Sequence, residues 1–305
     1  MRRPSNSNQH FARNPGGRRK HQNGIVPENT NRVELQGTKV GLISFHEIPD
    51  DHPDYSKLYK AQARCVYEMI NAHAEFDLLV FPGWTLANTK TLLSMLKHIS
   101  NTNTVAILEA LDTGITHAIS HGMLARSFEE QVFAESSEIE GDETKMEKFL
   151  DVFENHRQFS VCGASARLLI CGELNVLRNY QNRDNCVDFR FPGHQAFSKK
   201  FAEIFARTQI IVNPGHTPMG NQCKMIKRRE YLSQSGRLYC YTANYRKRGK
   251  KKMSSKQNPR WNRCPEVSKQ LLLKASLQYC YYDGCPVTGQ IASHDCNHIL
   301  RIYNI

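Results

Sequence analysis

Short apolar runs recur along the chain and alternate with longer segments in which apolar residues lie three or four positions apart. The apolar runs cover residues 40–45, 76–81, 105–108, 168–170, 210–212 and 238–243. Runs of this length, bounded by polar or turn residues, are typical of strands that are buried on both faces. We expect each run to be a strand of an internal sheet.

Three segments have the apolar spacing of an amphipathic helix, at residues 55–73, 142–154 and 193–206. We interpret their apolar stripes as faces that pack on the sheet. No glycine-rich phosphate loop precedes any of them, so no nucleotide or other cofactor is expected. Near the C-terminus, residues 277–282 and 298–303 are predicted to pair as a final hairpin around Gly284. The alternation of strands and helices favours a layered α/β protein.

The charge of the chain is concentrated in two segments. Of its 305 residues, 41 are Lys or Arg and 29 are Asp or Glu, which gives a formal net charge of +12. Residues 1–36 are basic and lack apolar periodicity, so we expect a disordered tail followed by a single domain over residues 37–305. Residues 246–263 hold a second basic run that includes Lys250, Lys251 and Lys252, interpreted as an exposed loop. Such a loop favours weak, salt-sensitive contact with nucleic acid or serves solubility alone.

Cysteine usage bears on the compartment. The chain has ten cysteines but neither a signal peptide nor an apolar stretch long enough to span a bilayer. We therefore expect a cytoplasmic protein with reduced thiols and no membrane contact. Five Cys and His residues near the C-terminus, at positions 280, 285, 294, 296 and 298, lack a CxxC knuckle, and no metal site is predicted there.

Cys171 is the cysteine with the most informative setting. It follows the apolar run 168–170 and precedes Gly172, which lets the backbone turn, and Glu173. A thiol delivered at the end of a buried strand faces a loop, where α/β enzymes expose nucleophiles. The alternative is that Cys171 is a small buried hydrophobe, as most cysteines are. We expect it at the C-terminal end of a central strand, in a concave pocket with Glu173 close by.

Several sequence blocks resemble the carbon-nitrogen hydrolase (nitrilase) superfamily in order and spacing over residues 38–305. The blocks are residues 40–45, 76–82, 170–173, 210–214 and 238–244. The resemblance implies an α/β fold of the nitrilase-like type, a four-layer α-β-β-α sandwich. It also implies a Glu-Lys-Cys active site that attacks amides or nitriles.

Two of the three catalytic positions of that family differ in this chain. Gly83 and then Trp84 follow Pro82, where the family has its glutamate. The strand expected to end in the family's lysine has residues 131–134 and no lysine at its end. A thiol is mostly protonated at neutral pH and needs a base or a cation to become nucleophilic.

Three other residues are candidates to replace the lost groups. Glu109, at the end of the run 105–108, is a candidate carboxylate, and Lys148, in the predicted helix 142–154, is a candidate cation. His216 is a candidate base, since a Cys-His pair suffices in unrelated hydrolases. Each also has an ordinary structural interpretation: Glu109 as a solvated residue at a strand end, Lys148 as a surface charge, and His216 as a residue that hydrogen-bonds within its loop.

These residues and the resemblance together are consistent with two functions from different classes. The first is a cysteine hydrolase that acts on a carbon–nitrogen bond of a small-molecule amide or nitrile through Cys171. Its substrate-binding residues are expected to be Glu173, Trp84, Asn213 and His46, which this fold would bring near the thiol. The alternative is an inactive nitrilase-like scaffold that binds a ligand, a protein or nucleic acid. Self-association into a homo-oligomer is left open by the sequence.

Overall fold

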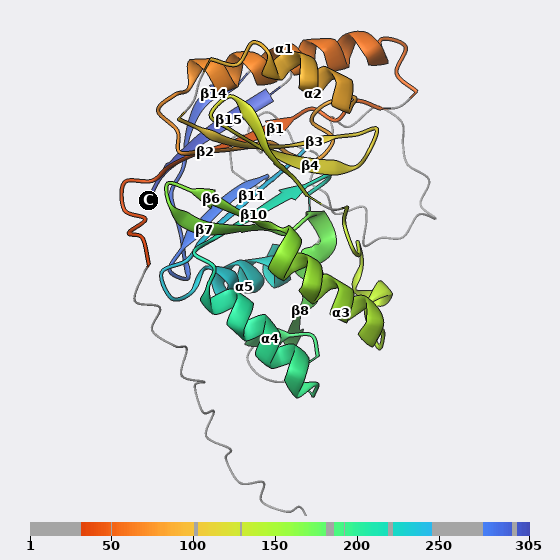
Figure 1. The fold of residues 1–305 in the computed structure, drawn as a ribbon, viewed down its shortest axis with the longest axis vertical. Helices are drawn as coiled ribbons and strands as arrows, with labels where there is room; N and C mark the ends of the chain where they lie inside the picture. Colours follow the sequence, from red (N-terminus) through yellow and green to blue (C-terminus); the bar gives the residue numbers. More distant parts are fainter. Residues whose placement is uncertain are drawn as a thin grey trace, which may run out of the picture.

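The protein consists of two face-to-face β-sheets covered on both outer sides by helices (Figure 1). The structure is a computed structural model and describes residues 32–49, 51–100, 103–128, 130–180, 186–191, 193–218, 222–245, 277–294 and 298–305. Helices α1 and α2 cover the first sheet, and α3, α4 and α5 cover the second. The predicted four-layer α-β-β-α sandwich is confirmed.

The first sheet has seven strands in the order β14-β15-β1-β2-β3-β4-β5. Its strands are β1 (Lys39–Phe45), β2 (Leu78–Val80), β3 (Val105–Ala110), β4 (Ile115–Ser120), β5 (Met123–Ser127), β14 (Gln290–His294) and β15 (His298–Asn304). Strands β1, β2 and β3 are parallel, and the outer strands pair antiparallel to their neighbours. The helices on its outer face are α1 (Tyr55–Ala72) and α2 (Thr89–Leu96).

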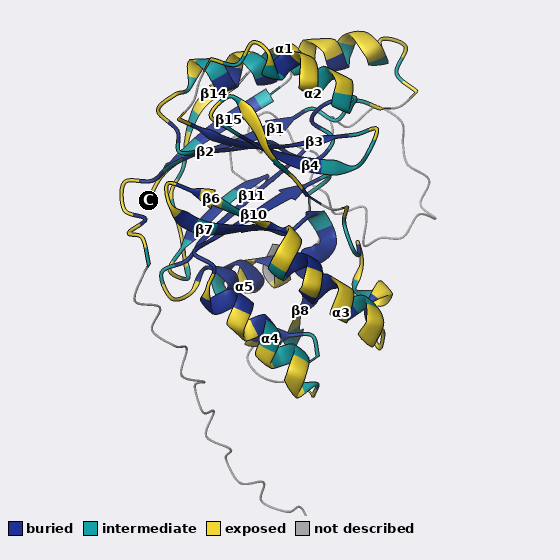
Figure 2. Cartoon of the chain, viewed as in Figure 1, coloured by how far each residue is buried: buried dark blue, intermediate teal, exposed yellow. Residues whose placement is uncertain are grey.

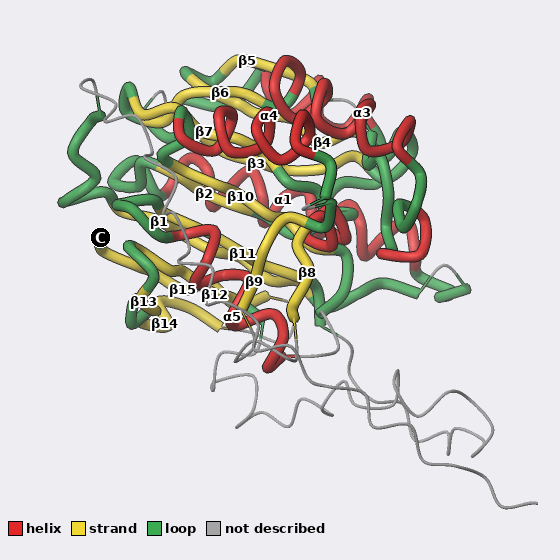
Figure 3. Tube along the Cα trace, turned by 90° about the horizontal axis from the view of Figure 1, so that it is seen from below, coloured by secondary structure: helices red, strands yellow, loops and turns green. Residues whose placement is uncertain are grey.

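The second sheet has six strands in the order β13-β12-β11-β10-β7-β6. Its strands are β6 (Gln158–Val161), β7 (Ala164–Leu168), β10 (Ile210–Gly215), β11 (Leu238–Ala243), β12 (Gln278–Tyr282) and β13 (Cys285–Pro286). Helices α3 (Glu143–Asp151), α4 (Gln195–Ala206) and α5 (Gln222–Ser233) lie outside it, beside the small ribbon of β8 (Leu177–Tyr180) and β9 (Cys186–Phe189). Seen from the side of these helices, the strands of the two sheets run in roughly the same direction (Figure 3).

The central strands are buried on both faces, which explains their continuous apolar sequences (Figure 2). In β1, Val40 and Leu42 contact the core between the two sheets, whereas Ile43 and Phe45 contact the core beneath α1 and α2. Successive side chains of a strand point to opposite faces, so one run of apolar residues serves two cores. The predicted strands at 40–45, 105–108, 210–212 and 238–243 are confirmed, whereas β2 covers only Leu78–Val80 of the run 76–81. The run 168–170 is a strand only at Leu168, where β7 ends.

Helix boundaries follow local capping. The side chain of Asp142 accepts a hydrogen bond from Lys145 N at 2.8 Å and begins α3, as Asn88 does for α2 through Thr91 N. The predicted helix 142–154 is in fact α3 followed by a π-helical turn over Val152–His156. No described helix combines the length and the apolar character of a membrane span.

Three sequence predictions about the fold are wrong. Residues 277–282 and 298–303 do not form a hairpin, because β12 pairs with β11 and β13 in the second sheet while β15 pairs with β1 and β14 in the first. Residues 131–134 are not a strand. The domain begins before residue 37, since Leu35 is buried and Val33 O accepts a hydrogen bond from Gln209 Nε2 at 2.7 Å. Residues 1–31, the rest of the predicted tail, lie outside the described residues.

Candidate active site

Cys171 stands at a strained turn three residues beyond Leu168, the last residue of strand β7. The pairing of β7 with β10 is extended by a hydrogen bond from Leu169 N to Val212 O at 2.9 Å, and Cys171 then begins a short 3₁₀ helix that ends at Val176. Its φ of 42° lies in the left-handed region, which non-glycine residues adopt rarely. The side chain is half-buried and packs against the core between the sheets.

Gly172 is required next to this cysteine. A Cβ at position 172 would lie 1.8 Å from the carbonyl oxygen of Ala134. Any side chain would therefore push the backbone of residues 131–134 away from the turn. The sequence predicted the turn at Cys171-Gly172 but not the backbone that crowds it.

A half-buried histidine and a buried glutamate form a pair beside the thiol. Nε2 of His216 lies 2.9 and 3.0 Å from the two carboxylate oxygens of Glu109. The Glu109 side chain is 1% exposed, and that of His216 is 18% exposed. Glu109 belongs to β3 of the first sheet and His216 follows β10 of the second, so the pair joins the two sheets where parallel strands end.

The imidazole of His216 interacts with both Glu109 and Cys171, and this sets its protonation. Burial lowers the pKa of His216, but hydrogen bonds and charge interactions with Cys171 and Glu109 outweigh burial and raise the pKa to about 10 from 6.5. The imidazole is therefore a cation at neutral pH. Because Nε2 is held by Glu109, Nδ1 is the ring nitrogen left for exchange of a proton with a thiol.

Trp84 and Gly83 enclose the imidazole. The Trp84 ring stacks on His216 with centroids 4.5 Å apart and an interplanar angle of 22°. Trp84 also has a left-handed backbone, with a φ of 58°. Its backbone N–H, not the indole N–H, donates to Glu109 Oε1 at 3.4 Å. A Cβ at position 83 would lie 2.1 Å from Cδ2 of His216, so the ring occupies space that exists because residue 83 is glycine. Asn244, which no sequence pattern marks as a site residue, holds this turn because its Nδ2 donates to Gly83 O at 2.7 Å.

Two of the predicted substrate-binding residues are engaged in the protein interior instead. The Glu173 carboxylate is 1% exposed, lies 3.2 Å from the Arg157 guanidinium and accepts hydrogen bonds from Val132 N and Ile170 N at 2.8 Å. Burial raises the pKa of Glu173, opposed by Arg157 and these amides. Asn213 is fully buried and bonds to carbonyl oxygens of the Cys171 turn. Both predictions are corrected, because the structure gives these side chains protein partners.

The remaining predicted residues lie elsewhere. Lys148 is exposed on α3, in the helix layer, while Cys171 faces the core between the sheets, so the predicted approach of this lysine is wrong. His46 follows β1, where it forms an isolated bridge to Tyr245 and meets the Tyr245 ring edge-on at 5.5 Å. The basic residues Lys250, Lys251 and Lys252 lie outside the described residues, as does Cys296 of the C-terminal Cys/His group.

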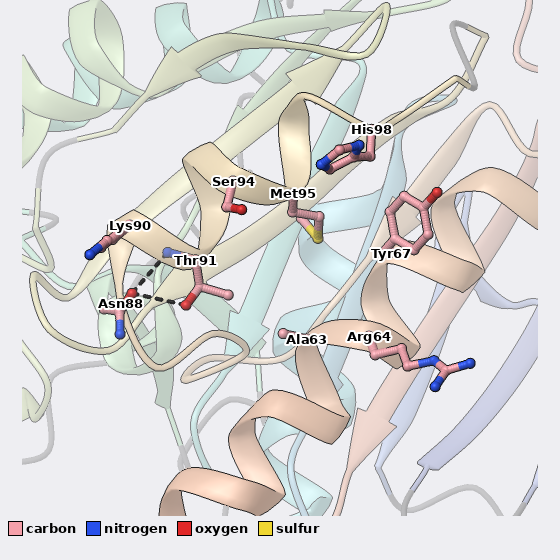
Figure 4. Close-up of a pocket in the computed structure, with 9 residues that line it drawn as sticks. All are labelled: Ala63, Arg64, Tyr67, Asn88, Lys90, Thr91, Ser94, Met95 and His98. Carbon is pink, nitrogen blue, oxygen red and sulfur yellow. Dashed lines mark hydrogen bonds between the residues drawn. The ribbon is translucent and has the colours of Figure 1, made fainter.

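A separate open groove of about 590 Å³ lies between α1 and α2, on the outer face of the first sheet (Figure 4). Its walls include Tyr67 and Arg64 of α1 and Lys90 of α2. None of the residues around His216 lines it. The groove is therefore distinct from the Cys171 site.

Cys171, His216 and Glu109 thus lie together in an α-β-β-α sandwich, as a thiol that interacts with a histidine–glutamate pair. The protein is similar in structure to an amidase from Nesterenkonia sp., with 9% identity and a TM-score of 0.48 over 90% of this chain and 92% of that one. A variant of the Nesterenkonia AN1 amidase, described as being from the nitrilase superfamily, is 11% identical with a TM-score of 0.48 over 92% and 93% of the two chains. A glutamine-dependent NAD(+) synthetase from Cytophaga hutchinsonii is 12% identical with a TM-score of 0.47, covering 88% of this chain and 43% of its own. No protein-family model and no curated protein matches the sequence.

Proposed function

We propose that this protein is a cysteine hydrolase that cleaves a carbon–nitrogen bond of a small amide or nitrile, with Cys171 as the nucleophile. The observation that carries the proposal is the His216–Glu109 pair, with 2.9 and 3.0 Å between Nε2 and the carboxylate oxygens, in contact with the thiol. The sequence blocks that resemble the nitrilase superfamily support a carbon–nitrogen bond over other acyl bonds. His216 and Glu109 supply one cation and one carboxylate, the two kinds of group that the thiol needs.

The imidazolium of His216 activates the sulfur of Cys171 and later protonates the leaving group. A cation next to a thiol stabilises the thiolate, which is the nucleophilic form. The sulfur of Cys171 attacks the carbonyl carbon of an amide, and the C–N bond breaks as His216 gives a proton to the departing nitrogen. This step leaves a thioester on Cys171, a free amine and a neutral imidazole.

Hydrolysis of the thioester restores the starting state. Neutral His216 takes a proton from water while the water oxygen bonds to the thioester carbon. The C–S bond then breaks, releasing a carboxylic acid and regenerating thiolate and imidazolium. Throughout, Glu109 holds Nε2, so that the same ring face and the same nitrogen are presented to the sulfur.

A comparison of two cysteines tests the activated thiol without knowledge of the substrate. Cys162 is a matched control because it is exposed but lies beside a carboxylate instead of a cation. Its thiol donates a hydrogen bond to Asp77 at 3.0 Å. Partial burial of the sulfur and the interaction with Asp77 raise the pKa of Cys162 to about 11. With limiting iodoacetamide at pH 7, mass spectrometry should find Cys171 modified first. The change His216→Gln should slow that modification by roughly 10²-fold, the lower end of the contribution of a positioned acid–base group.

Turnover is measured as ammonia release from a panel of short aliphatic amides and nitriles. Cys171→Ala should abolish release, while Cys162→Ser should leave it at the parent rate. Modification of Cys171 no faster than that of Cys162, together with no ammonia release, would reject the hydrolase and favour a scaffold that has lost catalysis.

A further inference from the structure

We infer that Asn213 is a positioning residue that fixes the turn of Cys171 to strand β10, which leads directly into His216; this inference rests on the proposed function. The Asn213 side chain is fully buried near the end of β10, three residues before His216. Its Nδ2 donates to Leu169 O at 2.7 Å and to Cys171 O at 3.2 Å. Its Oδ1 accepts from the Tyr239 hydroxyl at 2.9 Å.

The chemistry of the partners fixes the orientation of this amide. The two carbonyl oxygens of the turn can accept hydrogen bonds and cannot donate them, so they require the NH₂ end of Asn213. The Tyr239 O–H, on β11, supplies the donor that the amide oxygen needs. A flipped amide would place oxygen against two carbonyls in a buried site, which is unfavourable. Tyr239 thus sets the direction in which Asn213 donates.

The two accepting carbonyls flank the strained part of the chain. Leu169 precedes the left-handed turn, and Cys171 occupies it. The Asn213 side chain therefore holds the backbone on both sides of Ile170. A backbone in this strained conformation persists only when its surroundings constrain it. Asn213 is also continuous with His216 through Pro214 and Gly215, in a strand that is buried throughout. Asn213 therefore fixes the nucleophile relative to its acid–base partner, and the chain of contacts runs from Tyr239 through Asn213 to the Cys171 turn.

Two variants interrupt this chain at different points. Asn213→Asp keeps size and the acceptor for Tyr239 but removes both donated bonds. Tyr239→Phe keeps Asn213 and removes the hydroxyl that orients it. The matched control is Tyr303→Phe, which deletes another buried hydroxyl that donates a single hydrogen bond, to Gln278 O at 3.0 Å, far along the chain from the site.

The readouts are the iodoacetamide rate at Cys171 at pH 7 and, on an amide that the parent hydrolyses, kcat and KM. Loss of positioning should lower kcat and the alkylation rate together with little change in KM, because the ground-state contacts of the substrate persist. We expect a fall of roughly 10²-fold for Asn213→Asp, as for a reacting group misplaced by about 1 Å, and a fall of several-fold for Tyr239→Phe. Tyr303→Phe should lower thermal stability and leave both rates at parent values.

Equal alkylation rates at Cys171 in Tyr239→Phe and Tyr303→Phe would overturn the inference, and this comparison stands even when Asn213→Asp does not fold. The outcome is separable from the proposed function. If His216→Gln slows alkylation while Tyr239→Phe does not, the hydrolase site is retained and the positioning role of Asn213 is rejected.

Discussion

Gly83 gives the sharpest test of the proposed site, because its lack of a side chain makes room for the imidazole of His216. In Gly83→Ala, the new Cβ would lie 2.1 Å from Cδ2, 2.8 Å from Nε2 and 2.9 Å from Cγ of His216, whereas ordinary contact begins at 3.4 Å. The ring must therefore withdraw by more than 1 Å. It has little freedom to do so in place, since Trp84 stacks on it at 4.5 Å.

Withdrawal of the ring breaks the contacts that define its role. The two hydrogen bonds of Nε2 to Glu109 would lengthen, and the separation between the imidazole and Cys171 would change. A displacement of about 1 Å in a catalytic group costs on the order of 10²-fold in rate. We expect Gly83→Ala to lose about that factor in ammonia release and in alkylation of Cys171 at pH 7.

The control is a second glycine-to-alanine change in open space. A Cβ at Gly193 would meet no atom within 4 Å, so Gly193→Ala should keep parent rates. Denaturant unfolding of both variants separates a loss of fold from a displaced ring. Parent-like alkylation and turnover in a folded Gly83→Ala protein would refute the assignment of His216 to the catalytic position.

Two further predictions concern stability. The folded-state pKa of His216 is raised to about 10 from 6.5, so the contribution of His216 to the free energy of unfolding is fully present below pH 6.5 and is lost as the pH rises through 10. The free energy of unfolding of the parent should therefore fall between these two pH values. The same pH slope in a His216→Gln protein would contradict this prediction. Replacing Glu173 with Ala leaves the Arg157 guanidinium buried without its carboxylate. This change should lower the free energy of unfolding, measured by chemical denaturation, by about 3–5 kcal/mol. Glu173→Gln keeps one acceptor oxygen and should lower it by less.

The central strands and the turn at Cys171 were predictable because both depend on local sequence. A strand buried on two faces must be apolar throughout, and the runs at 40–45 and 238–243 show this directly. The turn at Cys171-Gly172 likewise follows from an apolar run that ends at a glycine. The failures lie where pairing is long-range: residues 277–282 and 298–303 have the pattern of strands, but nothing in that pattern says that they belong to different sheets.

Local sequence patterns predict the layered architecture and a short set of candidate residues that includes Cys171, Glu109 and His216. Which of these candidates meet depends on the packing of the two sheets. Glu109 and His216 come from different sheets, 107 positions apart, and their distance depends on how the sheets face each other. The same packing buries Glu173 against Arg157 and leaves Lys148 on the helix layer. A residue's type limits the chemistry available to it, but burial and partners, which long-range packing sets, select the chemistry that it performs.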